Sequence, residues 1–137
     1  MAKVTLELEY DYDFILIGIS CHARDYKFCW MVNKSLDLNF ARQDSLSLKT
    51  KNMTCEFAHY TFFDEDKHLE YTLLSNKGAN GFLLPEQKQA DYLLKIEGGF
   101  SAFQATELIN KIRNIEAVLT AFNIDIENLK SRQNLIL

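Results

Sequence analysis

The chain has 137 residues, of which 47% are hydrophobic and 25% are charged, and its formal net charge is −4. A chain of this length and hydrophobic content can build the core of a single folded domain without disulfides or a structural metal, which excludes a disordered protein. Its longest apolar run covers residues 14–19, far short of the roughly 20 residues of a membrane-spanning helix, so we expect no membrane span.

The first residues and the cysteines predict a cytoplasmic protein. Residues 1–3 lead directly into an alternating stretch, without the basic segment, apolar segment and cleavage site of a signal peptide. Three cysteines cannot all pair within the chain, and no two of them form a C-x-x-C motif: Cys21, Cys29 and Cys55. The chain has no cluster of lysine or arginine, which argues against direct binding of nucleic acid.

The first third of the chain predicts one strand and two helices. Strict alternation of apolar and polar residues over 4–10 is typical of a strand with one buried face. Residues 14–21 combine Gly18 with β-branched residues, a pattern that fits either a helix or a buried strand, and we favour the helix. A second helix is predicted over 25–36, with Asp25 at its N-terminus and Trp30 anchored in the core.

The middle of the chain predicts β-structure. Residues 53–63 and 68–75 alternate on either side of a charged break at 64–67, which predicts an antiparallel hairpin. Residues 75–81 hold two glycines and an Asn-Gly pair, the composition of a tight loop. A short apolar strand over 82–84 then stops at Pro85, which has no N–H to continue a ladder.

The last third predicts a β-α-β unit over residues 90–124. A strand over 90–97 ends at Gly98-Gly99, and Ser101 with Gln104 forms a capping box that starts a helix. A strand over 116–124 follows. The tail, 126–137, is weakly amphipathic and either docks back as a short helix or is offered to a partner. We therefore expect a single α+β domain over 1–137, with a mostly antiparallel sheet, N-terminal helices and a C-terminal β-α-β unit.

The stretch Leu84-Pro85-Glu86-Gln87-Lys88-Gln89-Ala90-Asp91-Tyr92 resembles the signature of a bacterial family, the IPExxxVDY family proteins. Leucine stands here for isoleucine, and alanine for valine. The resemblance extends to Asp13-Phe14, Gly18-Ile19-Ser20, Asp25-Tyr26, Ser75-Asn76-Lys77-Gly78 and Val118-Leu119-Thr120-Ala121. It implies a small cytoplasmic bacterial protein and supplies no activity and no catalytic residue. The residues themselves favour a shaped connection between two strands over a ligand-binding loop, because proline and polar residues before a strand are typical of turns.

No set of residues predicts catalysis, a metal site or a cofactor. Cys21 and His22 are adjacent, so their side chains diverge on a helix or a strand, which argues against a nucleophile–base pair with Asp25 as orienter. The histidines and cysteines lack the paired spacing of structural zinc. One loop could cradle an anion through backbone amides and a lysine, and its candidate residues are Ser75, Asn76, Lys77, Gly78, Asn80 and Gly81.

The aromatic residues of the predicted hairpin suggest the function. Tyr60 and Phe62 alternate with Phe57 and Phe63 onto opposite faces, so one set is exposed unless the helices over 14–21 and 25–36 cover it. We therefore expect a non-enzymatic protein-binding or adaptor domain that forms homodimers or binds a protein partner. The alternative is a regulatory domain that binds a small ligand or an anion through residues 75–92.

Overall fold

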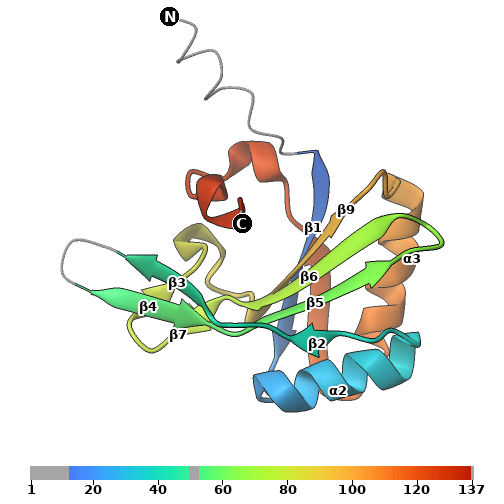
Figure 1. Cartoon of the computed structure of the whole chain (residues 1–137), viewed down its shortest axis with the longest axis horizontal. Coiled ribbons are helices and arrows are strands. Elements are labelled where there is room, and N and C mark those ends of the chain that lie inside the picture. The colour runs from blue at the N-terminus through green and yellow to red at the C-terminus, as the bar shows by residue number, and fades with distance from the viewer. Residues whose placement is uncertain (1–12, 50–52, 137) are drawn as a thin grey trace, which may run out of the picture.

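A computed structural model describes residues 13–49 and 53–136. Its centre is an antiparallel sheet with the strand order β10-β1-β9-β6-β5-β2 (Figure 1). The strands are β1 (Phe14–Cys21), β2 (Ala41–Arg42), β5 (His59–Asp64), β6 (Leu69–Ser75), β9 (Tyr92–Glu97) and β10 (Val118–Asn123). Two helices, α2 (Asp25–Leu36) and α3 (Ala102–Arg113), complete the α+β fold that the sequence predicts.

Residues 14–21 form the strand β1, so the helix that we favoured there is wrong. β1 lies between β9 and β10 and is antiparallel to both. Its side chains alternate between two cores, with Leu16 on one face and Ile17 and Ile19 on the other, and all three are buried. A strand buried on both faces reads as a continuous apolar run, which the sequence alone does not separate from a helix.

The helix predicted over 25–36 is confirmed as α2, but the role of Trp30 is wrong. The indole of Trp30 is 60% exposed, whereas the buried residues of α2 are Phe28, Cys29 and Val32. The face of α2 that packs on the sheet therefore carries Phe28, Cys29 and Val32, and Trp30 lies off this face.

The hairpin of β5 and β6 is confirmed, but the strand predicted over 53–63 divides into two. It breaks at Ala58 into β4 (Thr54–Phe57) and β5, because the hydroxyl of Ser75 accepts the Ala58 N–H at 2.8 Å. β4 then pairs with β3 (Leu46–Lys49) in a separate two-stranded sheet. The strand predicted over 82–84 is wrong beyond Phe82: β8 (Gly81–Phe82) pairs with β7 (Lys77–Gly78), and Leu83 and Leu84 are buried outside the ladder.

The helix with the capping box is confirmed as α3, and the strand predicted over 116–124 is confirmed as β10 (Val118–Asn123). The Ser101 hydroxyl accepts the Gln104 N–H, and the Gln104 side chain accepts the Ser101 N–H in return. β9 and β10, however, are not neighbours, since β1 lies between them and pairs with each. The segment is therefore not a crossover between adjacent parallel strands.

Both faces of the sheet are largely covered by other described segments of the chain, although Phe63 near the end of β5 is 52% exposed. α2 and α3 pack on the face that carries Tyr60 and Tyr71, and Phe62 lies partly buried among them. The opposite face is covered by β3, β4 and the C-terminal segment, with Phe57 in that second core. The helix that we expected to cover the first face from residues 14–21 is replaced by α3.

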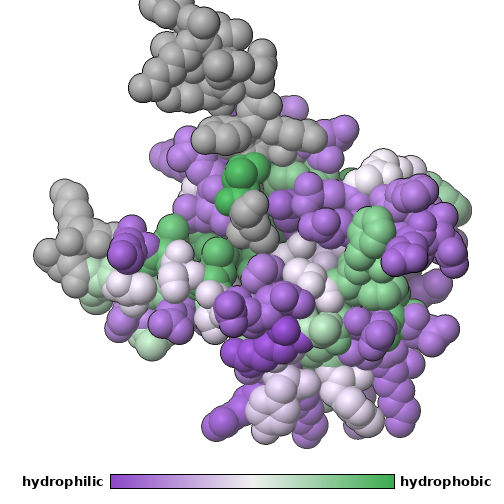
Figure 2. All heavy atoms as spheres, viewed as in Figure 1, coloured by the Kyte–Doolittle hydropathy of each residue, from purple (hydrophilic) through white to green (hydrophobic). Residues whose placement is uncertain are grey.

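The C-terminal segment docks back onto the domain as two short 3₁₀ turns, η2 (Ile126–Asn128) and η3 (Arg132–Leu135). Leu129 and Leu135 are buried in the second core. The strand predicted over 4–10 lies outside the described residues. Figure 2 shows hydrophilic side chains spread over much of the viewed face, with apolar patches between them. Within residues 13–49 and 53–136, no helix has the length and apolar character needed to cross a membrane.

Candidate functional site

Asn76, predicted as an anion ligand, is instead the internal brace of the segment 84–91. Its side chain is fully buried and donates to the carbonyls of Gln87 at 2.8 Å and Ala90 at 3.0 Å. The side-chain oxygen Oδ1 of Asn76 accepts a hydrogen bond from the Leu84 N–H at 2.7 Å. Because both amide hydrogens and the amide oxygen of the side chain are engaged in this way, Asn76 has little left to offer a ligand.

The first half of the signature stretch is also structural. Pro85 begins the 3₁₀ turn η1 (Pro85–Gln87), and the neighbouring Leu84 and Ala90 are fully buried. The Glu86 carboxylate accepts the N–H and the hydroxyl of Ser131 at 2.9 and 2.6 Å. Glu86 therefore holds the C-terminal segment against η1.

The second half of the signature stretch joins β9 to the end of β1. One oxygen of Asp91 accepts the Cys21 N–H at 2.8 Å, and the other lies 2.6 Å from Nζ of Lys77. The ring of Tyr92 stacks on Phe28 at 4.6 Å between centroids, and its hydroxyl donates to the carbonyl of Ala23 at 2.5 Å. Burial raises the pKa of Tyr92, so this phenol stays protonated and keeps the bond.

The remaining loop residues fall into two groups. Ser75, Lys77 and Gly78 line an open cavity of about 500 Å³. Asn80 and Gly81 do not line it. The Asn80 side-chain amide instead donates to the Thr54 carbonyl at 3.4 Å, and Gly81 pairs with Gly78 in the β7–β8 ladder.

That cavity adjoins a smaller one of about 270 Å³, and together they form what we call the polar cleft. The two cavities share Arg24, Ser75, Lys77 and Tyr92. The polar cleft thus brings together the loop 75–78, the end of the signature stretch and residues that the sequence did not connect to them. Arg24, Arg42 and Ser45 were missed because they come from separate elements and carry no shared motif.

A side-chain network fixes one wall of the polar cleft. The Asp25 carboxylate accepts hydrogen bonds from Nη1 of Arg42 at 2.9 Å and from the hydroxyl of Tyr60 at 2.7 Å. The guanidinium of Arg42 also lies over the Tyr60 ring, 5.5 Å from its centroid. Burial, and then the nearby Asp25 carboxylate, raises the pKa of Tyr60 to about 12, so its proton remains on the hydroxyl that bonds to Asp25.

Cys21 and His22 line the polar cleft without forming a catalytic pair. The Cys21 thiol is buried, and burial raises its pKa, which is the opposite of what a nucleophilic thiolate needs. Among the described residues, no group of three or more His, Cys, Asp or Glu side chains is placed to hold a metal ion.

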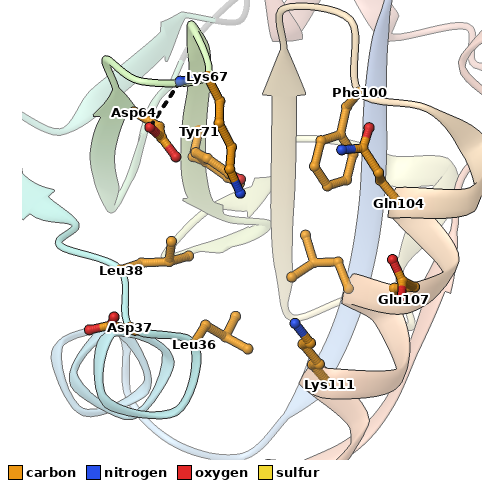
Figure 3. Close-up of a pocket in the computed structure, with 11 residues that line it drawn as sticks. Leu36, Asp37, Leu38, Asp64, Lys67, Tyr71, Phe100, Gln104, Glu107 and Lys111 are labelled. Carbon is orange, nitrogen blue, oxygen red and sulfur yellow. Dashed lines mark hydrogen bonds between the residues drawn. The ribbon is translucent and has the colours of Figure 1, made fainter.

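A second cavity, of about 360 Å³, opens between the C-terminal end of α2 and α3, and we call it the α2–α3 cavity (Figure 3). Leu36 and Leu38 extend into it from one side, and the side chains of α3 face them from the other. Its apolar lining is Leu36, Leu38, Tyr71, Phe100 and Leu108, and its polar lining is Asp37, Asp64, Lys67, Gln104, Glu107 and Lys111. The sequence did not single out this cavity, because α2, α3 and the β5–β6 hairpin meet only in the folded chain.

No protein-family model matches this chain, and no curated protein matches it at a significant level. The resemblance to the IPExxxVDY family therefore stays a prediction.

Proposed function

We propose that this domain is a non-enzymatic protein-binding module that holds an apolar side chain of a partner protein in the α2–α3 cavity. The observation that carries the proposal is the cavity's lining, which combines five apolar or aromatic side chains with six polar or charged ones that we call the rim. In a binding pocket, apolar side chains supply affinity and polar groups supply orientation, and this cavity offers both.

The size of the cavity favours a single anchor residue. Its volume of about 360 Å³ lies near the lower end of the roughly 300–1,000 Å³ that ligand pockets span. One bulky apolar side chain in such a pocket is the usual centre of a protein–protein contact. Phe103 is 73% exposed and lies one helical turn from Glu107, so it offers further aromatic surface beside the cavity.

The rim favours a partner segment with a positive charge next to the anchor. Three carboxylates line the cavity, Asp37, Asp64 and Glu107, against two ammonium groups, Lys67 and Lys111. Asp64 is partly engaged, since it accepts the N–H of Lys67 at 3.2 Å. Because the whole chain is also acidic, we infer a partner segment with one large apolar residue flanked by lysine or arginine.

Selection of random peptides on the immobilised full chain tests this function. We expect the enriched peptides to share an apolar anchor beside a basic residue. Glu107→Arg should weaken their binding about tenfold, because it turns an attractive rim charge into a repulsive one. The matched control is Glu116→Arg, an exposed acid away from the cavity, which should change binding less than about twofold.

Two outcomes contradict the proposal. Enriched peptides without the apolar–basic pattern, or equal weakening by both variants, would remove the α2–α3 cavity as the binding site. Leu108→Trp, which fills the cavity, adds a charge-independent check once thermal unfolding shows that the variant folds. A dimer by light scattering that dissociates in Leu108→Trp would replace the partner segment by a second copy of this chain.

A further inference from the structure

We propose that the polar cleft binds a small phosphate-bearing molecule through Arg24, Arg42 and Ser75. These residues come from three separate segments of the chain and line the same cavity of about 500 Å³. The site is independent of the α2–α3 cavity, with which it shares no lining residue.

Arg42 is oriented by contacts of Nη1 alone, which leaves the three N–H donors of Nε and Nη2 free among the described residues. It uses Nη1 alone for both Asp25 and the Tyr60 hydroxyl, at 2.9 and 3.2 Å. Within the described part of the chain, its Nε and Nη2 donate to no other group. Those two nitrogens form the edge of a guanidinium that takes two oxygens of a phosphate or carboxylate in parallel. The Asp25–Tyr60 network therefore orients the arginine in advance, which lowers the entropy lost on binding.

Arg24 and Ser75 add donors from the other sides of the cleft. The Arg24 guanidinium makes no hydrogen bond or ion pair with any residue in 13–49 or 53–136. The Ser75 oxygen accepts the Ala58 N–H, which leaves its own hydrogen for an acceptor in the cleft. Donors converging from three segments suit the tetrahedral oxygens of a phosphate better than the two coplanar oxygens of a carboxylate.

The charges around the larger cavity favour an anion, although the whole chain is acidic. Three cations line it, Arg24, Arg42 and Lys77, against two carboxylates, Asp25 and Glu56. The ion pair between Asp25 and Arg42 cancels one charge of each sign and leaves the excess of one positive charge in this lining unchanged. Lys77 is paired with Asp91 in the adjoining cavity, so we assign it a supporting role through its charge alone.

The volume favours a molecule larger than phosphate itself. A cavity of about 500 Å³ lies well within the roughly 300–1,000 Å³ range of small-molecule sites. Besides the cations, its walls include Phe57, Ala58, Ala79 and Tyr92, against which an uncharged part of the ligand can pack.

Chemical-shift titration of the full ¹⁵N-labelled chain tests the site, with inorganic phosphate, ribose 5-phosphate, AMP and citrate as probes at an ionic strength of about 0.15 M. We expect saturable shifts centred on Arg24, Arg42 and Ser75 for the two phosphate esters, and weaker binding of inorganic phosphate and citrate. Arg24→Gln should weaken the binding of both phosphate esters about tenfold, because it removes one charge-assisted hydrogen bond. Arg42→Lys, which keeps the charge opposite Asp25 but loses the forked edge, should do the same.

The matched control is Lys27→Gln, which removes an exposed cation three residues from Arg24 and outside the lining of the cleft. It should change affinity less than about twofold. Equal weakening by Lys27→Gln and Arg24→Gln would overturn the site in favour of diffuse charge attraction. Absence of saturable shifts with every probe, or tighter binding of citrate or bare phosphate than of both esters, would overturn the proposed ligand class.

Discussion

The side-chain oxygen of Asn76 accepts the N–H of Leu84 at 2.7 Å, across eight residues of chain and with no exposure to solvent. The same carboxamide donates to two carbonyls further along, those of Gln87 and Ala90. One buried side chain thus satisfies three backbone groups of an irregular segment that would otherwise be left unpaired in the interior.

Replacing Asn76 with alanine should therefore destabilise the domain strongly. Asn76→Ala leaves one N–H and two carbonyls without their partner, and we expect a loss of about 3 kcal/mol in the free energy of unfolding. Asn80→Ala, in the same loop but exposed, should cost less than about 0.5 kcal/mol. Urea denaturation measures both, and a similar loss for the two variants would contradict the bracing role of Asn76.

The C-terminal segment should behave as part of the core. Leu135 is fully buried in the cluster beneath the sheet, whereas its neighbour Ile136 is 36% exposed. Leu135→Ala should lower the free energy of unfolding by about 2–5 kcal/mol, and Ile136→Ala by less than about 1 kcal/mol. If Leu135→Ala left the melting temperature unchanged, the segment would not be docked in solution.

The contact between Glu86 and Ser131 should weaken in acid. Partial burial tends to raise the pKa of Glu86, but hydrogen bonds from the Ser131 hydroxyl and from the backbone of Glu86, Ser131 and Lys130 together outweigh it and hold the pKa below the ordinary 4.5. A carboxyl whose pKa is lowered by folding stabilises the fold fully above its ordinary pKa, and this contribution disappears as the pH falls through the lowered value.

A double-mutant cycle isolates that contact. Glu86→Gln and Ser131→Ala should show a coupling free energy at neutral pH that decreases once the pH drops below 4.5. Glu127→Gln, at an exposed position of the same segment, serves as the control and should show no coupling to Ser131→Ala. A coupling that is constant across this pH range would show that the charge on Glu86 is not what Ser131 binds.

Trp30, the single tryptophan of the chain, should report on an exposed site. Because its indole is 60% exposed, acrylamide should quench its fluorescence in the folded protein nearly as well as in urea. Trp30→Ala should change the free energy of unfolding by less than about 1 kcal/mol, including its cation–π contact with Lys34. Phe28→Ala, on the buried face of the same helix, should cost about 3–5 kcal/mol.

Cys29 should be unreactive while the protein is folded. Burial, and then the nearby Asp25 carboxylate, raises the pKa of its thiol to about 11. The shift from 9.0 leaves about a hundredfold less thiolate at neutral pH, in addition to the steric protection of a buried side chain. In a Cys21→Ala/Cys55→Ala variant, labelling by a thiol reagent should become rapid only in denaturant, and rapid labelling of the folded variant would contradict this environment.

The local sequence pattern was sufficient to predict those helices and strands that have a strong hydrophobic period or a defined cap. Helix α3 was predictable because Ser101 and Gln104 satisfy each other's backbone groups within four residues. The β5–β6 hairpin was predictable because alternation resumes across a short charged turn. Strand β1 was not, since an apolar run buried on both faces has no period to read.

The candidate sites depended still more on tertiary structure. The sequence drew attention to residues 75–92, but it could not show that Asn76 is buried while Lys77 lines the cleft. Arg24 and Arg42 are 18 residues apart in number, and only the packing of α2 against β2 and β5 brings both to one cavity.

By itself, the sequence determined an α+β domain with an antiparallel sheet, because burial periods and caps are properties of short segments. The tertiary structure decided which polar side chains form hydrogen bonds within the fold and which remain available to bind a ligand. That division depends on which distant backbone groups need a partner, as Leu84 needs Asn76 and Ser131 needs Glu86, and such needs arise only when the chain has closed on itself.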